Sequence, residues 1–127
     1  MPTAGRHCMI ELWECPAAIL DDPAAVRAAM MAAVAIANCE LLSECAHRFE
    51  PHGFTIVGLL AESHISVHTW PEHGYAAADV FTCGARGEPE AACVELARAL
   101  QAGRYELRTV LRGVPGGLAH ATAERSG

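Results

Sequence analysis

The chain has 127 residues, 52% of them hydrophobic, and its 9 basic and 15 acidic side chains give a formal net charge of −6. This length predicts a single domain, and the acidic balance without any basic cluster argues against nucleic acid or an anionic membrane surface as the partner. The first residues lack the features of a signal peptide and no apolar run is long enough to span a bilayer. We therefore expect a cytoplasmic protein whose six cysteines are mostly small buried side chains.

Hydrophobic periodicity and turn residues divide the chain into strands and helices. Strands are predicted where apolar and polar residues alternate, and helices where apolar residues recur every third or fourth position after a start signal such as Asp22-Pro23. In chain order, the predicted elements are a strand at His7–Glu14, a helix from Pro23, strands at Glu40–Arg48, Phe54–Ala61, Ser63–Thr69 and Tyr75–Cys83, a helix from Pro89 that ends at Gly103, a strand at Tyr105–Leu111, and a flexible tail at residues 112–127.

Short turns join most of these strands, and strands joined by short turns pair antiparallel. The pattern predicts an α+β fold, a two-layer sandwich in which both helices cover one face of an antiparallel sheet within a single domain of residues 1–111. Phe54–Ala61 carries apolar residues on both sides. We therefore expect the other face of the sheet to be covered by a second copy of the chain in a homodimer.

Reactive side chains are concentrated in the segment Leu60–Gly84, and several explanations fit them one at a time. Zinc could be held by His64, His68 and Cys83, although the usual closely paired ligand spacing is missing. A thiol beside an imidazole, as in a Cys83 and His68 pair, could act as a nucleophile. Each residue alone is most simply explained by packing and hydrogen bonding within a sheet.

Together these residues form a specific pattern: Glu62-Ser63-His64 where a strand starts, then His68, then Trp70-Pro71-Glu72, then Phe81-Thr82-Cys83-Gly84. The pattern resembles the prokaryotic S-adenosylmethionine decarboxylases, which are self-processing enzymes whose pyruvoyl cofactor is made from an internal serine. The resemblance extends from Gly5-Arg6-His7 to the helix that ends near Gly103.

The resemblance implies that the proenzyme cleaves itself between Glu62 and Ser63. In the family the serine hydroxyl attacks the preceding carbonyl to form an ester, and loss of the serine α-proton then expels the carboxylate and leaves a pyruvoyl group. A β chain of residues 1–62 and an α chain of residues 63–127 would result. His68 matches the histidine that transfers a proton in processing, and Thr55 matches a second processing hydroxyl, which is a serine in relatives.

For the mature enzyme, the resemblance implies that the pyruvoyl group forms a Schiff base with S-adenosylmethionine and draws electrons from the carboxylate as CO2 leaves. Cys83 matches the proton donor. Phe49 and Trp70 match aromatic positions around the adenine, Glu72 matches an acidic residue for the ribose, and Glu11 lies where it could hold a cationic group of the substrate. The product would supply aminopropyl groups for spermidine, and no metal is expected.

Two alternatives stay open from the sequence. A pyruvoyl-dependent decarboxylase of arginine or ornithine could share the fold, but a free amino acid has no adenosine for Phe49, Trp70 and Glu72 to bind. An uncleaved structural or regulatory dimer would have no use for Ser63, His68 and Cys83 in one segment. The sequence also departs from the family at His73, where tyrosine is common.

Overall fold

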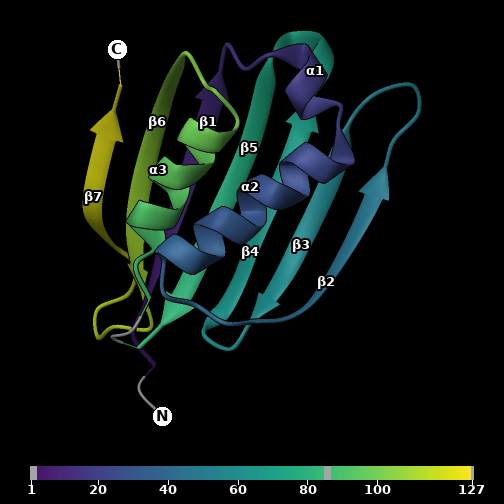
Figure 1. Ribbon diagram of the computed structural model, residues 1–127. Helices are drawn as coiled ribbons and strands as arrows, with labels where there is room; N and C mark the ends of the chain where they lie inside the picture. The colour runs from purple at the N-terminus through teal and green to yellow at the C-terminus, as the bar shows by residue number, and fades with distance from the viewer. Residues whose placement is uncertain (1–2, 85–86, 127) are drawn as a thin grey trace.

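The computed structural model describes residues 3–84 and 87–126. Strands dominate this part of the chain, and three helices and one short 3-10 turn connect them (Figure 1). In chain order, the elements are β1 (Gly5–Trp13), α1 (Ala17–Leu20), α2 (Pro23–Ile36), β2 (Leu41–Arg48), β3 (Phe54–Leu60), β4 (Ser63–Trp70), η1 (Pro71–His73), β5 (Tyr75–Cys83), α3 (Pro89–Ala99), β6 (Arg104–Arg112) and β7 (Ala119–Arg125).

The seven described strands form one sheet in the order β2-β3-β4-β5-β1-β6-β7, and every neighbouring pair is antiparallel. Strands β2 to β5 form a meander, and β1 is inserted between β5 and β6. The register places Thr55 opposite His68, and Ser63 opposite Thr82. This confirms the predicted antiparallel α+β sandwich.

Helices α2 and α3 cover one face of the sheet. Asp22 caps α2 by accepting a hydrogen bond from the amide of Ala24 at 3.0 Å, and the apolar stripe that begins at Val26 is buried against the strands. The predicted stripe of α3, including Cys93 and Leu96, is buried in the same core. Alanines at several contact positions, such as Ala33, allow the helix to lie close to the sheet.

The structure corrects the prediction of a flexible tail at residues 112–127. Gly116 and Gly117 adopt positive φ angles of 95° and 92°, which glycine tolerates best, and they turn the chain back so that β7 pairs with β6. The amide of Ser126 extends this pairing by donating to the carbonyl oxygen of Tyr105 at 2.9 Å. Because the side chains of β7 are mostly small or charged, its pairing depends on backbone hydrogen bonds, which hydrophobic periodicity does not reveal. The short helix α1 was likewise not predicted.

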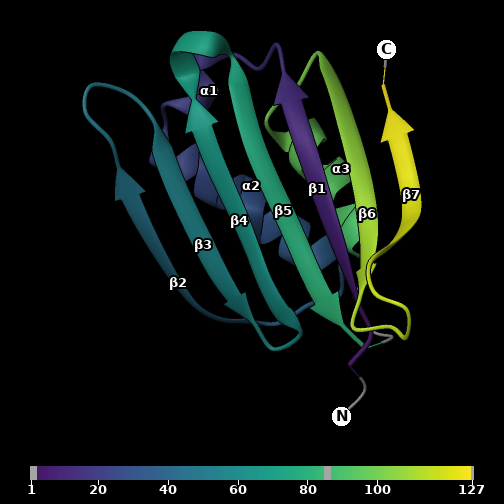
Figure 2. The ribbon, with the colours of Figure 1, turned by 180° about the vertical axis from the view of Figure 1, so that it is seen from behind.

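The other face of the sheet carries none of the described helices, as Figure 2 shows. Large apolar side chains are exposed on it, with Met9 44%, Leu59 52% and Trp70 42% accessible. This open face holds most of the side chains that the sequence analysis selected. Among the described residues, no helix is long and apolar enough to cross a membrane.

Candidate active site

Ser63 begins β4, directly after the tight connection from β3, and its backbone conformation is unusual. Its φ angle is 155°, a value that residues with a side chain rarely adopt. The carbonyl oxygen of Glu62 accepts a hydrogen bond from the backbone amide of Cys83 at 2.9 Å. The peptide bond between Glu62 and Ser63 is therefore constrained by its own backbone and held by the end of β5.

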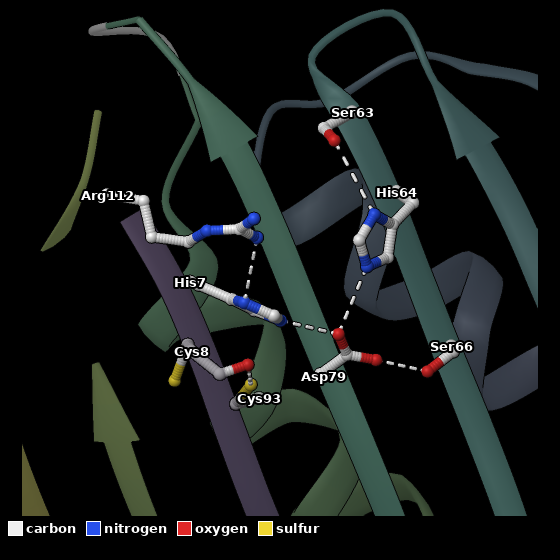
Figure 3. A network of polar contacts seen from close by, with 8 residues as sticks. All are labelled: His7, Cys8, Ser63, His64, Ser66, Asp79, Cys93 and Arg112. Carbon is white, nitrogen blue, oxygen red and sulfur yellow. Dashed lines mark hydrogen bonds and ion pairs between the residues drawn. The ribbon is translucent and has the colours of Figure 1, made fainter. Parts of the chain in front are cut away.

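A network of polar side chains lies beside this peptide bond (Figure 3). The hydroxyl oxygen of Ser63 is 3.5 Å from Nδ1 of His64, and Nε2 of His64 is 3.0 Å from Oδ2 of Asp79. The same carboxylate oxygen lies 2.6 Å from Nε2 of His7 on β1, and Ser66 donates to the other oxygen. Three adjacent strands thus place two imidazoles around one carboxylate.

The partners of Asp79 and His7 fix the protonation of this network. Burial alone would raise the pKa of Asp79, but hydrogen bonds from Ser66, His7 and His64 outweigh it and lower the pKa below its usual value. Arg112 of β6 has a guanidinium nitrogen 3.3 Å from Nδ1 of His7. Since arginine can only donate, Nδ1 of His7 is the acceptor and its Nε2 carries the proton that is donated to Asp79.

His7, His64 and Asp79 could also coordinate a metal ion, because their ligand atoms lie within 4.8 Å of one another. Among the described residues they are the one group of this kind. A histidine that binds metal through Nε2 keeps a proton on Nδ1 and donates it to an acceptor. Arg112 faces that nitrogen of His7 with a donor instead. The arrangement therefore suits a hydrogen-bonded network better than a metal centre.

His68 lies at the opposite end of β4 from the Ser63 network. Its Nδ1 is 3.0 Å from the hydroxyl oxygen of Thr55 on β3, so the structure pairs the two predicted processing groups. His68 lies five positions after Ser63 in a continuous strand, which is about 16 Å at the usual rise per residue. Within one chain, His68 cannot reach the Ser63 hydroxyl or α-carbon.

The distances along these strands exclude, within one chain, the zinc site and the nucleophilic pair that the sequence analysis considered. His64 and His68 are about 13 Å apart along β4, too far to share one zinc ion. His68 pairs with Ala77 on β5, and Cys83 lies six residues, or about 20 Å, further along that strand. A nucleophilic pair of Cys83 and His68 is therefore absent within one chain.

Aromatic and acidic side chains gather at the His68 end of the open face. Tyr75 lies between Trp13 and Trp70, with ring centroids 4.4 and 5.2 Å away, and its hydroxyl donates to Glu11. Burial, together with this hydrogen bond and the carboxylate charge, raises the pKa of Tyr75 to about 12. Glu11 and Trp70 thus occupy the same part of the sheet, as a binding site for a flat cationic molecule would require.

The other two predicted binding residues lie at this end of the molecule. Phe49 follows β2, is 47% exposed, and contacts the ring of His47 at 4.7 Å between centroids. Glu72 lies in η1 and lines a shallow hollow of about 340 Å³ that it shares with residues of α1, Asp21 and His52. Neither residue approaches Ser63 of its own chain in the described contacts.

Sequence reasoning missed His7, Asp79 and Arg112 as members of the site. His7 and Arg112 are separated by 105 positions, and only the pairing of β1 with β5 and β6 brings the three together. The one local signal was Asp79 itself, a charged residue in the middle of a strand rich in alanine.

Comparison with known proteins agrees with this geometry. A family model described as S-adenosylmethionine decarboxylase matches residues 6–113. An S-adenosylmethionine decarboxylase proenzyme of Prochlorococcus marinus (strain MIT 9211) is 50% identical over 111 residues, covering 87% of this chain and 91% of that protein. One of Methanococcus maripaludis (strain S2) is 41% identical over 114 residues, covering 90% and 93%.

A solved structure resembles the whole fold. The crystal structure of the adenosylmethionine decarboxylase from Aquifex aeolicus superimposes with a TM-score of 0.82 at 38% sequence identity, covering 90% of this chain and 94% of that one. Sequence, structure and the Glu62 to Cys83 motif all agree, and the chain belongs to the S-adenosylmethionine decarboxylase family.

Proposed function

We propose that this protein cleaves itself between Glu62 and Ser63 and then decarboxylates S-adenosylmethionine with the pyruvoyl group that this cleavage leaves on Ser63. Membership of a family whose relatives are named proenzymes supports this proposal. The observation that carries it is the peptide bond itself. Ser63 has a rarely adopted φ angle, and the Glu62 carbonyl oxygen is held by the Cys83 amide.

These features suit attack by the Ser63 hydroxyl on the Glu62 carbonyl carbon. A hydrogen bond to the carbonyl oxygen stabilises the negative charge that develops there during the attack, as in an oxyanion hole. Backbone strain that is relieved when the peptide bond becomes an ester lowers the barrier further. The residues present therefore fit a pyruvoyl group formed at position 63.

In the mature enzyme, the pyruvoyl group supplies a carbonyl that takes up the electrons released as CO2 leaves. Protonation of carbon then needs an acid, and we assign it to the half-buried thiol of Cys83, at the end of β5 beside the cleavage point. A well-placed acid contributes about 10²–10⁴-fold to rate. The acidic and aromatic cluster of Glu11, Tyr75 and Trp70 would bind the substrate.

One chain does not contain a complete site, because His68 is about 16 Å from Ser63. We infer that two copies pack with their open faces together, so that the His68 end of one chain lies over the Ser63 end of the other. Such an isologous contact would create two equal sites and cover the exposed Met9 and Leu59. Thr55, His68, Phe49 and Trp70 would then serve the partner's Ser63.

Decarboxylation of arginine or ornithine is the competing activity on this fold. Exposed Trp70 and Phe49 favour a substrate with a flat base, because stacking on an aromatic ring is worth about 1–3 kcal/mol per base in single-strand nucleic-acid binders. None of the relatives compared above is named for a basic amino acid.

The test is the intact mass of the purified protein after denaturation, with and without cyanoborohydride in the presence of S-adenosylmethionine and arginine together. We expect two chains divided at Ser63, with reduction adding the mass of the decarboxylated nucleoside to the second chain. An adduct derived from arginine would replace the proposed substrate, and a single chain that never splits would overturn the proposal.

A further inference from the structure

The hydroxyl of Ser63 has a candidate base within its own chain. The side chain of His64 places Nδ1 3.5 Å from the Ser63 hydroxyl oxygen and Nε2 3.0 Å from Oδ2 of Asp79 (Figure 3). A carboxylate only accepts hydrogen bonds, so Nε2 of a neutral His64 carries the ring proton. The unshared electron pair of Nδ1 is therefore left to face the Ser63 hydroxyl.

We propose that His64 is the catalytic base of the first step of self-cleavage, in which the Ser63 hydroxyl attacks Glu62. This inference rests on the proposed function and deepens it, because it separates two proton transfers. His68 of the partner chain is left to act on the Ser63 α-proton in the later elimination. His64 needs no partner chain, since it is already beside the hydroxyl.

The step balances without any further reactant. The Ser63 hydroxyl gives its proton to Nδ1 of His64 while its oxygen bonds to the carbonyl carbon of Glu62, whose oxygen becomes the anion that the Cys83 amide stabilises. When this adduct collapses, the bond from carbon to the Ser63 nitrogen breaks and the imidazolium returns its proton to that nitrogen. The peptide has become an ester with a free amine, with no net change in atoms.

Asp79 acts as a positioning residue for His64. It is held in turn by Ser66 and by His7, and Arg112 fixes the tautomer of His7 while lying over Phe81 at 4.3 Å. An ionised Asp79 favours the Nε2-protonated form of His64 and stabilises the imidazolium that forms during the attack. The order serine, histidine, aspartate is that of the hydrolase triad, but the two ring nitrogens are exchanged: Nδ1 of His64 faces the serine and Nε2 faces the aspartate.

The test follows the fate of the peptide bond in His64→Gln, which keeps a polar side chain but has no basic nitrogen. Newly made wild-type and variant chains are denatured at intervals, and each sample is divided into untreated and hydroxylamine-treated halves before its intact mass is taken. Hydroxylamine cleaves an ester at Ser63 but leaves an amide uncut. His120→Gln, at an exposed position in β7, is the matched control and should split like the wild type.

We expect His64→Gln to split about 10²–10⁴-fold more slowly than the wild type, and the uncut chain to resist hydroxylamine because the first step is blocked. If the uncut variant is cleaved by hydroxylamine, the ester has formed and His64 is not its base. Splitting at the wild-type rate also overturns the inference. If the wild type itself never splits, both the proposed function and the inference about His64 fail.

A second measurement decides the case in which His64→Gln does not fold. In Ser63→Ala protein with ¹⁵N-labelled histidine, nitrogen chemical shifts should show neutral His64 protonated on Nε2, and Asp79→Asn in the same background should abolish that preference. A neutral His64 protonated on Nδ1 would have no electron pair toward residue 63 and would overturn the proposal.

Discussion

Cys83 contributes two separate groups at the residue scale, its backbone amide and its thiol. The amide donates to the Glu62 carbonyl, whereas the thiol is the group proposed to protonate the substrate carbon. In Cys83→Ser the amide is unchanged, so we expect normal splitting. Turnover should fall about 10²-fold or more, because a hydroxyl is a far weaker acid than a thiol. Intact mass measures splitting and release of CO2 measures turnover; a variant with normal turnover would dismiss Cys83 as the acid.

Trp70 makes a prediction about binding rather than chemistry. It is 42% exposed on the open face beside Tyr75, so its removal leaves no buried cavity. If an adenine stacks on it, Trp70→Ala should raise KM for S-adenosylmethionine by about 5- to 150-fold, the equivalent of 1–3 kcal/mol. Splitting should be unaffected, and Trp70→Phe should recover most of the binding. An unchanged KM in Trp70→Ala would mean that the ring serves packing alone.

At the scale of elements, α3 is attached to the sheet by Glu90 near its start. Arg6 of β1 lies 2.6 Å from the Glu90 carboxylate, and Thr109 of β6 donates to the same group. Burial opposes ionisation, but these hydrogen bonds outweigh it and lower the pKa of Glu90 below its usual value. One carboxylate thus joins three elements.

Glu90→Gln should lower the free energy of unfolding at neutral pH by about 1.5–3 kcal/mol, as expected for a hydrogen-bonded charge. Because the pKa of Glu90 is lower in the folded state, its contribution is complete above the unfolded value and is lost as pH falls through the folded value. The difference from wild type should therefore shrink as the pH is lowered past the usual pKa of a glutamate and through the lower folded value, as measured by urea unfolding at a series of pH values. Glu14→Gln is the control, because the Glu14 carboxylate is 66% exposed in its ion pair with Arg104, and it should lower the free energy of unfolding by less than about 1 kcal/mol. A loss in Glu14→Gln as large as that in Glu90→Gln would contradict the role assigned to Glu90.

Helices and strands were predictable from the sequence where a single hydrophobic period dominated a segment. The alternation around Ser63–Thr69 and the apolar stripe of α2 gave the correct buried faces. β7 was not predictable, because its described side chains are exposed and its pairing depends on backbone hydrogen bonds. The Ser63 and Cys83 motif could be recognised from local sequence, but the Asp79 network could not, since strand order and register place His7 and Arg112 beside it.

For the whole molecule, the open face raises the question of how separate ends of one sheet form a single site. Ser63, His64 and Cys83 lie at one end of the face, and Thr55, His68 and Trp70 lie at the other. Turning a second copy by a two-fold rotation brings unlike ends together. Such an arrangement also explains why large apolar side chains remain exposed on one chain.

Mixed dimers separate action within one chain from action between chains. Neither Ser63→Ala nor His68→Ala alone should split into two chains, because the first lacks the hydroxyl and the second lacks the proton transfer of the elimination. When the two are produced together, a mixed dimer contains one intact pair, the Ser63 of the His68→Ala chain facing the His68 of its partner. We therefore expect the His68→Ala chain, and only that chain, to split, in up to about half of the molecules if mixing is random.

The two chains are distinguished by a small difference in mass, and each variant produced alone is the control. Splitting of the His68→Ala chain only in the mixture would show that the partner supplies the imidazole, as we expect from the separation of about 16 Å between His68 and Ser63 within one chain. If the mixture stays uncut while the wild type splits, His68 acts within its own chain, and β4 would have to bend so that its two ends meet. Since β4 is paired with β3 from Ser63 to Thr69 and with β5 from Ser63 to Trp70, that bend would break the centre of the sheet, and we expect the dimer to be the less costly arrangement.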